Sequence, residues 1–398
     1  MRSLALAGTL FMAACSPAQL LRPDPPPPPT PATVSDAPQQ VLCKRTAPLF
    51  LYVQSQHVGG DGSLAAPYGT IGDALTAGAV QGACDLRLQL LGGAFPESFA
   101  VTVPRLDITA TGGINIINGA ILNTGNRLAV RGVVINAVGS TGIRQLGGRL
   151  QLFGVTVTNP TTDPKNLNSG IGLWLSDGAQ ATIDFVILTN NAHQGLRVEG
   201  PGTEAWLSGV VVSNTGIHPG VLAHMAAGTA EEDYWGAVEV TRGAKAIIKY
   251  STITGSVLRG LDVDHSAQAL VVSSGITRTS DVPLGPFSTA GAYNLTSRKN
   301  ASVETFRLFT RDALVDLVLD EAYLTMHHGV VGGADIGLAY GNLPVVPGQV
   351  GALCAGLDGT AFTDVVIPMQ SGDLTVLPPD AVVDPALCGH VVDDPRPL

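Results

Sequence analysis

The sequence predicts an all-β solenoid, in which short strands wind repeatedly around one axis. Three observations lead to this fold class: a phrase that recurs about every 23 residues, apolar residues that alternate within the phrase, and a composition rich in turn-forming residues. Only 14% of the 398 residues are charged and 5% are aromatic, whereas the chain has 48 Gly and 27 Pro. This composition suits many short strands and tight turns better than long helices.

Residues 1–14 have the pattern of a secretory signal peptide. Arg2 precedes an apolar stretch, Leu4 to Ala14, that is too short to span a bilayer. The stretch ends in Met12-Ala13-Ala14-Cys15, which resembles the lipobox of bacterial lipoproteins. The resemblance implies that Cys15 is lipidated and that the protein is exported. With Ser16 next, it implies an outer-membrane anchor on the periplasmic or cell-surface face. The alternative is that Cys15 is an ordinary residue of a cleaved signal peptide.

Residues 15–42 are interpreted as a tether between the lipid and the folded body. The run Arg22-Pro23-Asp24-Pro25-Pro26-Pro27-Pro28-Pro29-Thr30-Pro31 favours an extended polyproline II spacer. A ligand for a proline-recognition domain is the alternative. The membrane is therefore an expected partner through the N-terminal lipid, without a spanning helix.

Four further cysteines fall into two pairs at opposite ends of the body, Cys43 with Cys84 and Cys354 with Cys388. An exported protein would oxidise them. Three connectivities are possible, and proximity in the sequence favours these two local disulfides. Zinc is disfavoured because the sequence has no Cys-x-x-Cys motif and no His/Cys cluster, so we expect no metal site and no cofactor.

The repeated phrase indicates stacked coils. From Arg127 the chain reads RLAVRGVVINAVGSTGIRQLGG, and KAIIKYSTITGSVLRGLDVDHSA is a later compact copy. Apolar residues alternate in short runs, as at Val210 and Val212, which is typical of strands with one buried face. The apolar face of one coil can be buried only by the next coil, so the coils stack into a continuous core. Strand-ending asparagines are expected to align at one corner of the stack; they are Asn136, Asn159, Asn190 and Asn214.

These repeats resemble right-handed parallel β-helix proteins, the pectate-lyase-like group, over roughly Leu49 to Asn342. The resemblance implies a single-stranded right-handed parallel β-helix over residues 43–342. The segment Gly59 to Leu75 is similar to the opening of many such domains, a glycine-rich turn followed by a short capping helix. Thr70 is a plausible N-cap, with Asp73 near the positive end of the helix dipole. No Gly-Lys-Ser/Thr follows the glycines, so nucleotide binding is not expected.

Residues 343–398 depart from the repeated phrase. The segment after Asn342 reads LPVVPGQVGALCAGLDG and leads into a tail rich in Pro and Asp. We interpret residues 343–398 as a C-terminal cap and tail, closed by the disulfide between Cys354 and Cys388, which protects the last coil from end-to-end strand pairing.

Candidate binding residues lie on the strand that follows the corner where the coils vary in length. Inserts occur there at Pro160–Ser169, Ile217–Trp235 and Asp281–Thr289, and in the resembled family the substrate groove lies beside the following strand. With apolar positions inward, one outward column is predicted to contain Arg144, Trp174, Arg197, Glu239 and Asp262. A second is predicted to contain Ser176, Glu199, Thr241 and Asp264. An aromatic platform with arginines and carboxylates fits a polysaccharide; an ordinary solvated strand face is the alternative.

Candidate catalytic residues are His193, Arg259 and His265. His193 and Arg259 lie in compact versions of the variable corner, and Asp264-His265 is similar to an Asp-His pair of pectate lyases. The longest insert adds His218, His224, Glu231, Glu232 and Asp233. Such groups could remove a proton next to a uronate carboxylate while an arginine stabilises the enolate. The sequence lacks the Asn-Thr-Asp, Gly-His-Gly and Arg-Ile-Lys strings of the polygalacturonase-like branch, so hydrolysis by paired aspartates is not carried over.

The leading functional hypothesis is a non-catalytic, glycan-binding or adhesive rod anchored to the outer membrane. The alternatives are a polysaccharide lyase or epimerase that acts on acidic, uronate-containing glycans, and a purely structural envelope protein. The net charge of -10 and the absence of a Lys/Arg run argue against a nucleic-acid partner, because the field of the protein would repel phosphates.

Overall fold

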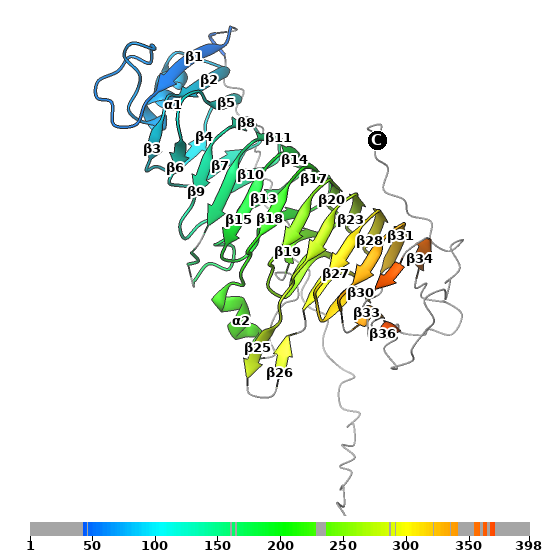
Figure 1. The fold of residues 1–398 in the computed structure, drawn as a ribbon. Helices are drawn as coiled ribbons and strands as arrows, with labels where there is room; N and C mark the ends of the chain where they lie inside the picture. The colour runs from blue at the N-terminus through cyan, green and yellow to red at the C-terminus, as the bar shows by residue number, and fades with distance from the viewer. Residues whose placement is uncertain are drawn as a thin grey trace, which may run out of the picture. The chain divides into compact units, whose positions relative to one another are not determined.

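The chain folds as a right-handed parallel β-helix, as the sequence predicts (Figure 1). The computed structural model describes residues 43–340, apart from 46, 160, 164, 228–235, 286–287, 291, 321 and 335. It also describes residues 354–358, 361–363 and 367–370. The described residues form one compact unit. The described residues form two helices, α1 (Ile71–Val80) and α2 (Pro219–Ala226).

Each coil contributes one strand to each of three parallel sheets, which the chain enters in the order sheet 1, sheet 2, sheet 3. Sheet 1 consists of β1 (Leu49–Val53), β2 (Asp85–Leu90), β5 (Arg105–Ala110), β8 (Arg127–Arg131), β11 (Arg149–Phe153), β14 (Gln180–Asp184), β17 (Glu204–Ser208), β20 (Lys245–Lys249), β23 (Gln268–Val272), β28 (Ser302–Phe306), β31 (Tyr323–His327) and β34 (Cys354–Asp358).

Sheet 2 consists of β3 (Gly93–Phe95), β6 (Asn115–Ile117), β9 (Val134–Asn136), β12 (Thr156–Asn159), β15 (Ile187–Asn191), β18 (Val211–Ser213), β21 (Thr252–Thr254), β24 (Gly275–Thr277), β29 (Phe309–Arg311), β32 (Val330–Gly332) and β35 (Ala361–Thr363). Sheet 3 consists of β4 (Phe99–Val101), β7 (Ile121–Thr124), β10 (Ile143–Leu146), β13 (Leu173–Ser176), β16 (Leu196–Glu199), β19 (Gly236–Thr241), β22 (Arg259–Val263), β27 (Tyr293–Arg298), β30 (Val315–Asp320), β33 (Ile336–Tyr340) and β36 (Ile367–Gln370).

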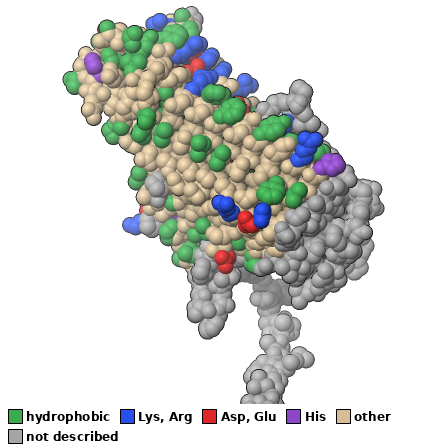
Figure 2. Space-filling view, viewed as in Figure 1, with side chains coloured by type: hydrophobic (Ala, Val, Ile, Leu, Met, Phe, Trp, Pro, Cys, Tyr) green, Lys and Arg blue, Asp and Glu red, His purple; other side chains and the backbone are tan. Residues whose placement is uncertain are grey.

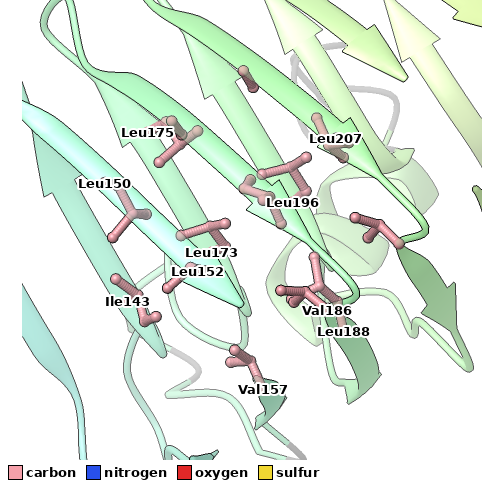
Figure 3. Close-up of a cluster of buried hydrophobic side chains, with 14 of the residues drawn as sticks. Ile143, Leu150, Leu152, Val157, Leu173, Leu175, Val186, Leu188, Leu196 and Leu207 are labelled. Atoms are coloured by element: carbon pink, nitrogen blue, oxygen red, sulfur yellow. The ribbon is translucent and has the colours of Figure 1, made fainter. Parts of the chain in front are cut away.

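The core runs along the axis of the stack and is built from the alternating apolar residues of all three sheets. In β2, for example, Leu86, Leu88 and Leu90 are buried while the residues between them are partly exposed. Figure 3 shows side chains from neighbouring coils, among them Leu173 and Leu196, meeting inside the solenoid. Each fully buried side chain of this kind contributes about 1.5 to 3 kcal/mol. The continuity of this core couples each coil to its neighbours.

Helix α1 covers the N-terminal end of the stack, as predicted. The hydroxyl of Thr70 accepts a hydrogen bond from the backbone N–H of Asp73 at 2.9 Å. The carboxylate of Glu97 accepts hydrogen bonds from the N–H groups of Ile71 and Gly72 at 2.6 and 2.8 Å. Three of the N–H groups that a helix start leaves unpaired are therefore satisfied, with two acidic side chains near the positive end of the dipole.

The stack extends past Asn342, where the sequence pattern fades. Strands β34, β35 and β36 pair in parallel with β31, β32 and β33 and add one further coil. The repeated phrase is hard to follow there because 13 residues, 341–353, separate β33 from β34. Cys354 begins β34, whereas Cys388, and with it the predicted second disulfide, lies outside the described residues.

The predicted asparagine corner is only partly regular. The amide of Asn136 donates to Asn118 at 3.1 Å, and that of Asn214 donates to Asn190 at 3.4 Å. Asn159 departs from the prediction, because the register shifts between Thr158 and Asn159 and turns this side chain into the interior. There its amide donates to the backbone carbonyl of Ile171 at 3.2 Å.

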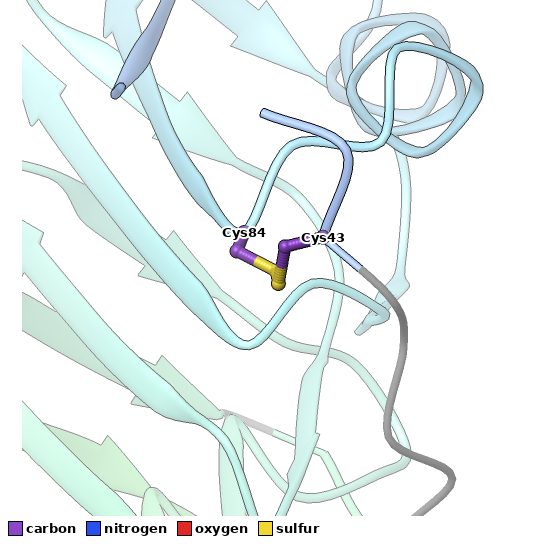
Figure 4. The surroundings of a disulfide bond; sticks show 2 residues. All are labelled: Cys43 and Cys84. Carbon is purple, nitrogen blue, oxygen red and sulfur yellow. A yellow bond between two sulfur atoms is a disulfide. The ribbon is translucent and has the colours of Figure 1, made fainter. Parts of the chain in front are cut away.

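The predicted disulfide between Cys43 and Cys84 is confirmed, with the two Cα atoms 5.5 Å apart (Figure 4). It ties the segment before β1 to the residue that precedes β2, at the end of the stack where coils have a neighbour on one side only. Its sequence separation of 41 residues makes it an effective constraint on the unfolded chain.

We expect the double variant Cys43→Ser, Cys84→Ser to lose about 2 to 4 kcal/mol of unfolding free energy relative to the oxidised protein. Urea unfolding followed by circular dichroism measures the difference. A reducing agent should bring the wild-type midpoint close to that of the variant. Equal midpoints for the oxidised wild type and the variant would contradict a stabilising role.

Candidate functional site

The predicted outward column of sheet 3 is confirmed in register. Arg144 pairs with Trp174, Trp174 with Arg197, Arg197 with Glu239 and Glu239 with Asp262. Most of this column is not accessible to a ligand, and the alternative of an ordinary solvated strand face is wrong for it as well. Trp174 is 8% exposed, Arg197 is 1% exposed, and Glu239 and Asp262 are fully buried. The charged side chains of the column can be buried because they form ion pairs and hydrogen bonds with one another, which offset the cost of removing them from water.

Trp174 lies between two arginines on neighbouring strands. The guanidinium carbon of Arg144 is 4.2 Å from the ring centroid, and that of Arg197 is 5.5 Å from it. The indole Nε1 donates a hydrogen bond to Glu199 Oε2 at 3.2 Å. These contacts fix the ring in a cation–π arrangement, so the indole acts as a rigid wall.

The middle of the column is a network of ion pairs around two glutamates. Glu199 accepts hydrogen bonds from Arg197 Nε at 3.0 Å and from Arg242 Nη1 at 2.6 Å. Glu239 Oε2 accepts from Gln194 and lies 3.9 Å from Arg197 Nη1. Burial raises the pKa of Glu239 to about 8 and outweighs the opposing charge of Arg197. Glu239 therefore carries a proton at neutral pH.

The C-terminal part of the column is organised around Asp262 and Asp264. Asp262 Oδ2 accepts from Arg259 Nη1 at 2.7 Å and from Arg298 Nη2 at 3.0 Å, and Arg298 Nη2 also reaches Asp264 at 3.1 Å. Burial alone would raise the pKa of Asp262, but the charges of Arg259 and Arg298 lower it below its usual value. Burial and the neighbouring Asp262 raise the pKa of Asp264.

Arg298 is a residue that the sequence reasoning missed. Its coil follows the insert that contains the antiparallel hairpin of β25 (Val282–Gly285) and β26 (Ser288–Ala290), which interrupts the repeated phrase. Alignment of Leu295 with Leu261, which the structure pairs, would have placed Arg298 in the second outward column. The hairpin and helix α2 are neighbours, so the two longer inserts do rise on the same side of the stack (Figure 1).

The predicted catalytic residues are held in separate local contacts. His193 is 2% exposed, and its ring centroid is 5.5 Å from that of His218. Arg259 pairs with Asp262, as described above. His265 Nδ1 is 3.1 Å from Asp264 Oδ2, and its Nε2 is 3.2 Å from Lys299 Nζ. Glu231, Glu232 and Asp233 lie outside the described residues.

A groove of about 390 Å³ lies on the outer face of sheet 3, at the N-terminal side of this column. Strands β4, β7, β10 and β13 form its floor, and the first insert, within 160–169, borders it. Its described lining residues are Ser98, Phe99, Ala100, Ala120, Ile121, Leu122, Ser140, Thr141, Arg144, Asn166, Asn168 and Trp174. The groove therefore contains two of the predicted binding residues, Arg144 and Trp174, and none of the predicted catalytic residues.

Arg144 is the only ionisable residue among the described residues that line the groove. Its Nε is buried without a hydrogen-bond partner, and no described carboxylate lies within ion-pair distance of its guanidinium. Arg197, Arg259 and Arg298, by contrast, are all neutralised by carboxylates. The groove thus offers an uncompensated positive charge beside an aromatic wall.

The other groove residues could be anticipated only in part. The insert at 160–169 is visible in the sequence as a change in coil length, and it supplies Asn166 and Asn168, whose amides can bond hydroxyl groups. Leu122 lies one coil before Arg144 in the same outward column. That coil precedes the first clear copy of the repeat, so its register was not evident.

No three His, Cys, Asp or Glu side chains in the described ranges are grouped as they would need to be to hold a metal ion. Within the same ranges, no helix has both the length and the apolar character needed to cross a membrane.

Comparisons with known proteins concern the fold. No protein-family model matches the sequence, and no curated protein matches it. The structure of pectate lyase Pel9A is similar at 12% identity, with 80% of this chain and 79% of that chain covered and a TM-score of 0.48. A pectin methylesterase from Aspergillus niger is similar at 13% identity, with 84% and 91% covered and a TM-score of 0.29.

The buried network predicts a pH dependence of stability. The pKa of Glu239 is about 8 in the folded chain and has its ordinary value of 4.5 in the unfolded chain. Between these values the folded chain holds a proton that the unfolded chain has released, so stability falls as pH rises from about 4.5 to 8. Asp316, whose pKa burial raises to about 7, acts in the same direction.

We expect Glu239→Gln to remove part of this slope. As pH rises from 5 to 9, the unfolding free energy of the variant should fall by roughly 2 to 4 kcal/mol less than that of wild type. Urea unfolding at several pH values measures this difference. Parallel stability curves for Glu239→Gln and wild type would contradict a protonated Glu239.

Proposed function

We propose that this β-helix binds an acidic glycan in the groove on sheet 3 without transforming it. The observation that carries the proposal is the guanidinium of Arg144, which lies in the groove without a carboxylate partner and is held against Trp174. A uronate carboxylate or a sulfate group would supply the missing partner through charge-assisted hydrogen bonds. The part of Trp174 that lines the groove and the amides of Asn166 and Asn168 would contact the sugar ring and its hydroxyls.

The positions of the ionisable residues favour binding over catalysis. A lyase or epimerase needs a base next to the proton that it removes, within reach of the bound sugar. The described lining contains no carboxylate and no histidine, and Arg259 and His265 are engaged with Asp262 and Asp264 in the buried network. Incubation with uronate polymers while the absorbance of unsaturated ends is followed tests the lyase alternative directly, since a lyase would generate such ends.

Substitutions in the groove test the binding proposal. We expect Arg144→Gln to weaken binding of an acidic polymer such as polygalacturonate about 10-fold to 100-fold, because one hydrogen bond to a charged group contributes roughly 1.5 to 3 kcal/mol. Trp174→Phe should weaken it less, because an apolar ring remains. Isothermal titration calorimetry measures both changes.

Arg149→Gln is the matched control, since Arg149 is an exposed arginine on sheet 1, away from the groove. Its affinity for the polymer should equal that of wild type. If Arg144→Gln bound as tightly as Arg149→Gln, or if no acidic polymer bound the wild type, a glycan site in this groove would be ruled out.

We further propose that the protein is a lipoprotein anchored to the outer membrane through Cys15. The support is the sequence Met12-Ala13-Ala14-Cys15 after an apolar stretch, followed by a proline-rich spacer. Several acyl chains on one cysteine would bind a membrane firmly, at about 0.8 kcal/mol for each buried methylene group.

Replacement of the proposed lipidated cysteine tests the anchor. We expect Cys15→Ser to move most of the protein from the membrane fraction of the producing cell to the soluble fraction. Cys43→Ser, which changes a cysteine outside the proposed lipobox, should stay with the membranes. Membrane retention of Cys15→Ser would contradict lipid attachment at this residue.

A further inference from the structure

The outer face of sheet 2 is free of charge over six consecutive coils. Strands β9, β12, β15, β18, β21 and β24 contain no Asp, Glu, Lys or Arg. We call their outer side the uncharged face. Charged residues make up 14% of the whole chain, and none of them lies in these six strands. Figure 2 shows one side of the molecule, on which Lys and Arg are most numerous near one end and a smaller group of basic and acidic side chains lies further along.

The uncharged face has an ordered chemistry. Its first outward column includes the exposed side chains of Ile187 and Val211. The next column presents hydroxyl groups, which bond in pairs along the axis: Ser213 to Thr189 at 2.9 Å, and Thr277 to Thr254 at 3.0 Å. Apolar contact and hydroxyl groups are therefore offered side by side, about 4.8 Å apart from one coil to the next.

Three exposed aromatic residues border this face at the corner between sheets 1 and 2. Phe153, Phe185 and Tyr250 are 54%, 63% and 61% exposed. The rings of Phe153 and Phe185 meet edge to face with their centroids 5.7 Å apart. The ring of Phe185 also lies over Gly209 of the next coil, where an added Cβ would come within 3.0 Å of it. We call these three residues the aromatic edge.

Phe185 and Tyr250 occupy backbone positions that would suit glycine better. Their φ angles are +53° and +51°, in the left-handed region that bulky residues avoid. Gly154 and Gly209 occupy the equivalent corner position in other coils, with φ angles of +59° and +63°. An aromatic residue there is both strained and exposed, so neither backbone geometry nor core packing accounts for it. Ser273 and Arg307 occupy the same corner in later coils with similar φ angles, so what sets Phe185 and Tyr250 apart is the exposed aromatic ring.

The size of the surface decides between two kinds of partner. Six strands at about 4.8 Å spacing and roughly four residues across give an area of about 24 Å by 13 Å, near 300 Å². A stable contact with a second copy of the chain needs about 800 Å² on each partner. A charged partner would lose hydration without gaining an ion pair. A narrow, uncharged polymer fits both limits.

We propose that the uncharged face and its aromatic edge bind a neutral, β-1,4-linked polysaccharide chain. The backbone positions of Phe185 and Tyr250 are two coils and therefore about 10 Å apart, a spacing comparable to the length of a β-1,4-linked disaccharide. Their rings stack on the apolar faces of the sugar rings. The hydroxyls of Thr189, Ser213 and Thr254 bond the sugar hydroxyls. This surface is separate from the groove at Arg144, because it lies on a different sheet.

The test is retention of the purified full-length chain on microcrystalline cellulose and on chitin. We expect wild type to bind at least one of these polymers, and the double variant Phe185→Gly, Tyr250→Gly to bind at least 10-fold more weakly. Because glycine suits both backbone positions, the melting temperature of the double variant should stay within a few degrees of wild type. Thr189→Lys, which adds a charge to the face, should weaken binding to the same polymer.

Two controls separate this site from other surfaces. Arg144→Gln, which changes the groove, should bind the neutral polymer as wild type does. Val58→Ala changes an exposed apolar residue elsewhere and should also have no effect. The proposal is overturned if wild type is retained by neither polymer, if the double variant is retained equally, or if Thr189→Lys abolishes self-association of the chain instead.

Discussion

Burial of one coil's apolar face by the next coil is the interaction on which the rest of this molecule depends. A single coil cannot enclose its own leucines and valines, and the strands of all three sheets find hydrogen-bond partners only in neighbouring coils. The ends of the stack are therefore its weak points. Helix α1 and the disulfide between Cys43 and Cys84 both lie at the N-terminal end, where they cover and constrain the first coils.

The same stacking explains why charged side chains on sheet 3 can be buried. Parallel pairing in register places equivalent residues of successive coils about 4.8 Å apart, so a column of outward residues becomes a column of contacts. On sheet 3 the buried arginines are neutralised by carboxylates of the same or the neighbouring strand, as Arg197 is by Glu199 and Arg298 by Asp262. Arg144, at the start of the column, is the exception, because its neighbours are Leu122 and Trp174. The groove therefore has an uncompensated positive charge because the column has no acidic residue on the strands next to Arg144.

The two proposed binding surfaces differ in chemistry because they lie on different sides of the solenoid. Sheet 3 follows the corner where coils vary in length, so loops can border a groove and exclude water around a single charge. Sheet 2 follows a tight corner whose residues adopt left-handed φ angles, and no long insert covers its exposed residues Ile187 and Val211. A groove suits one charged group held in place, whereas a flat face suits a repeating polymer that is contacted weakly at many positions.

The sequence by itself determined the repeat, the parallel β-helix, the capping helix and the register of the Arg144 to Asp262 column, because these follow from alternation of apolar residues and their recurrence in each coil. Sequence proximity was also enough to pair Cys43 with Cys84. It could not determine the solvent exposure of that column, since burial depends on which side chains of adjacent coils pair with one another. Nor could it reveal the inward turn of Asn159, which results from a register shift of one residue. Only the tertiary structure decided that Arg144 keeps an unpaired charge while Arg197 and Arg259 do not, because charge compensation is a property of three-dimensional neighbours and not of residue type.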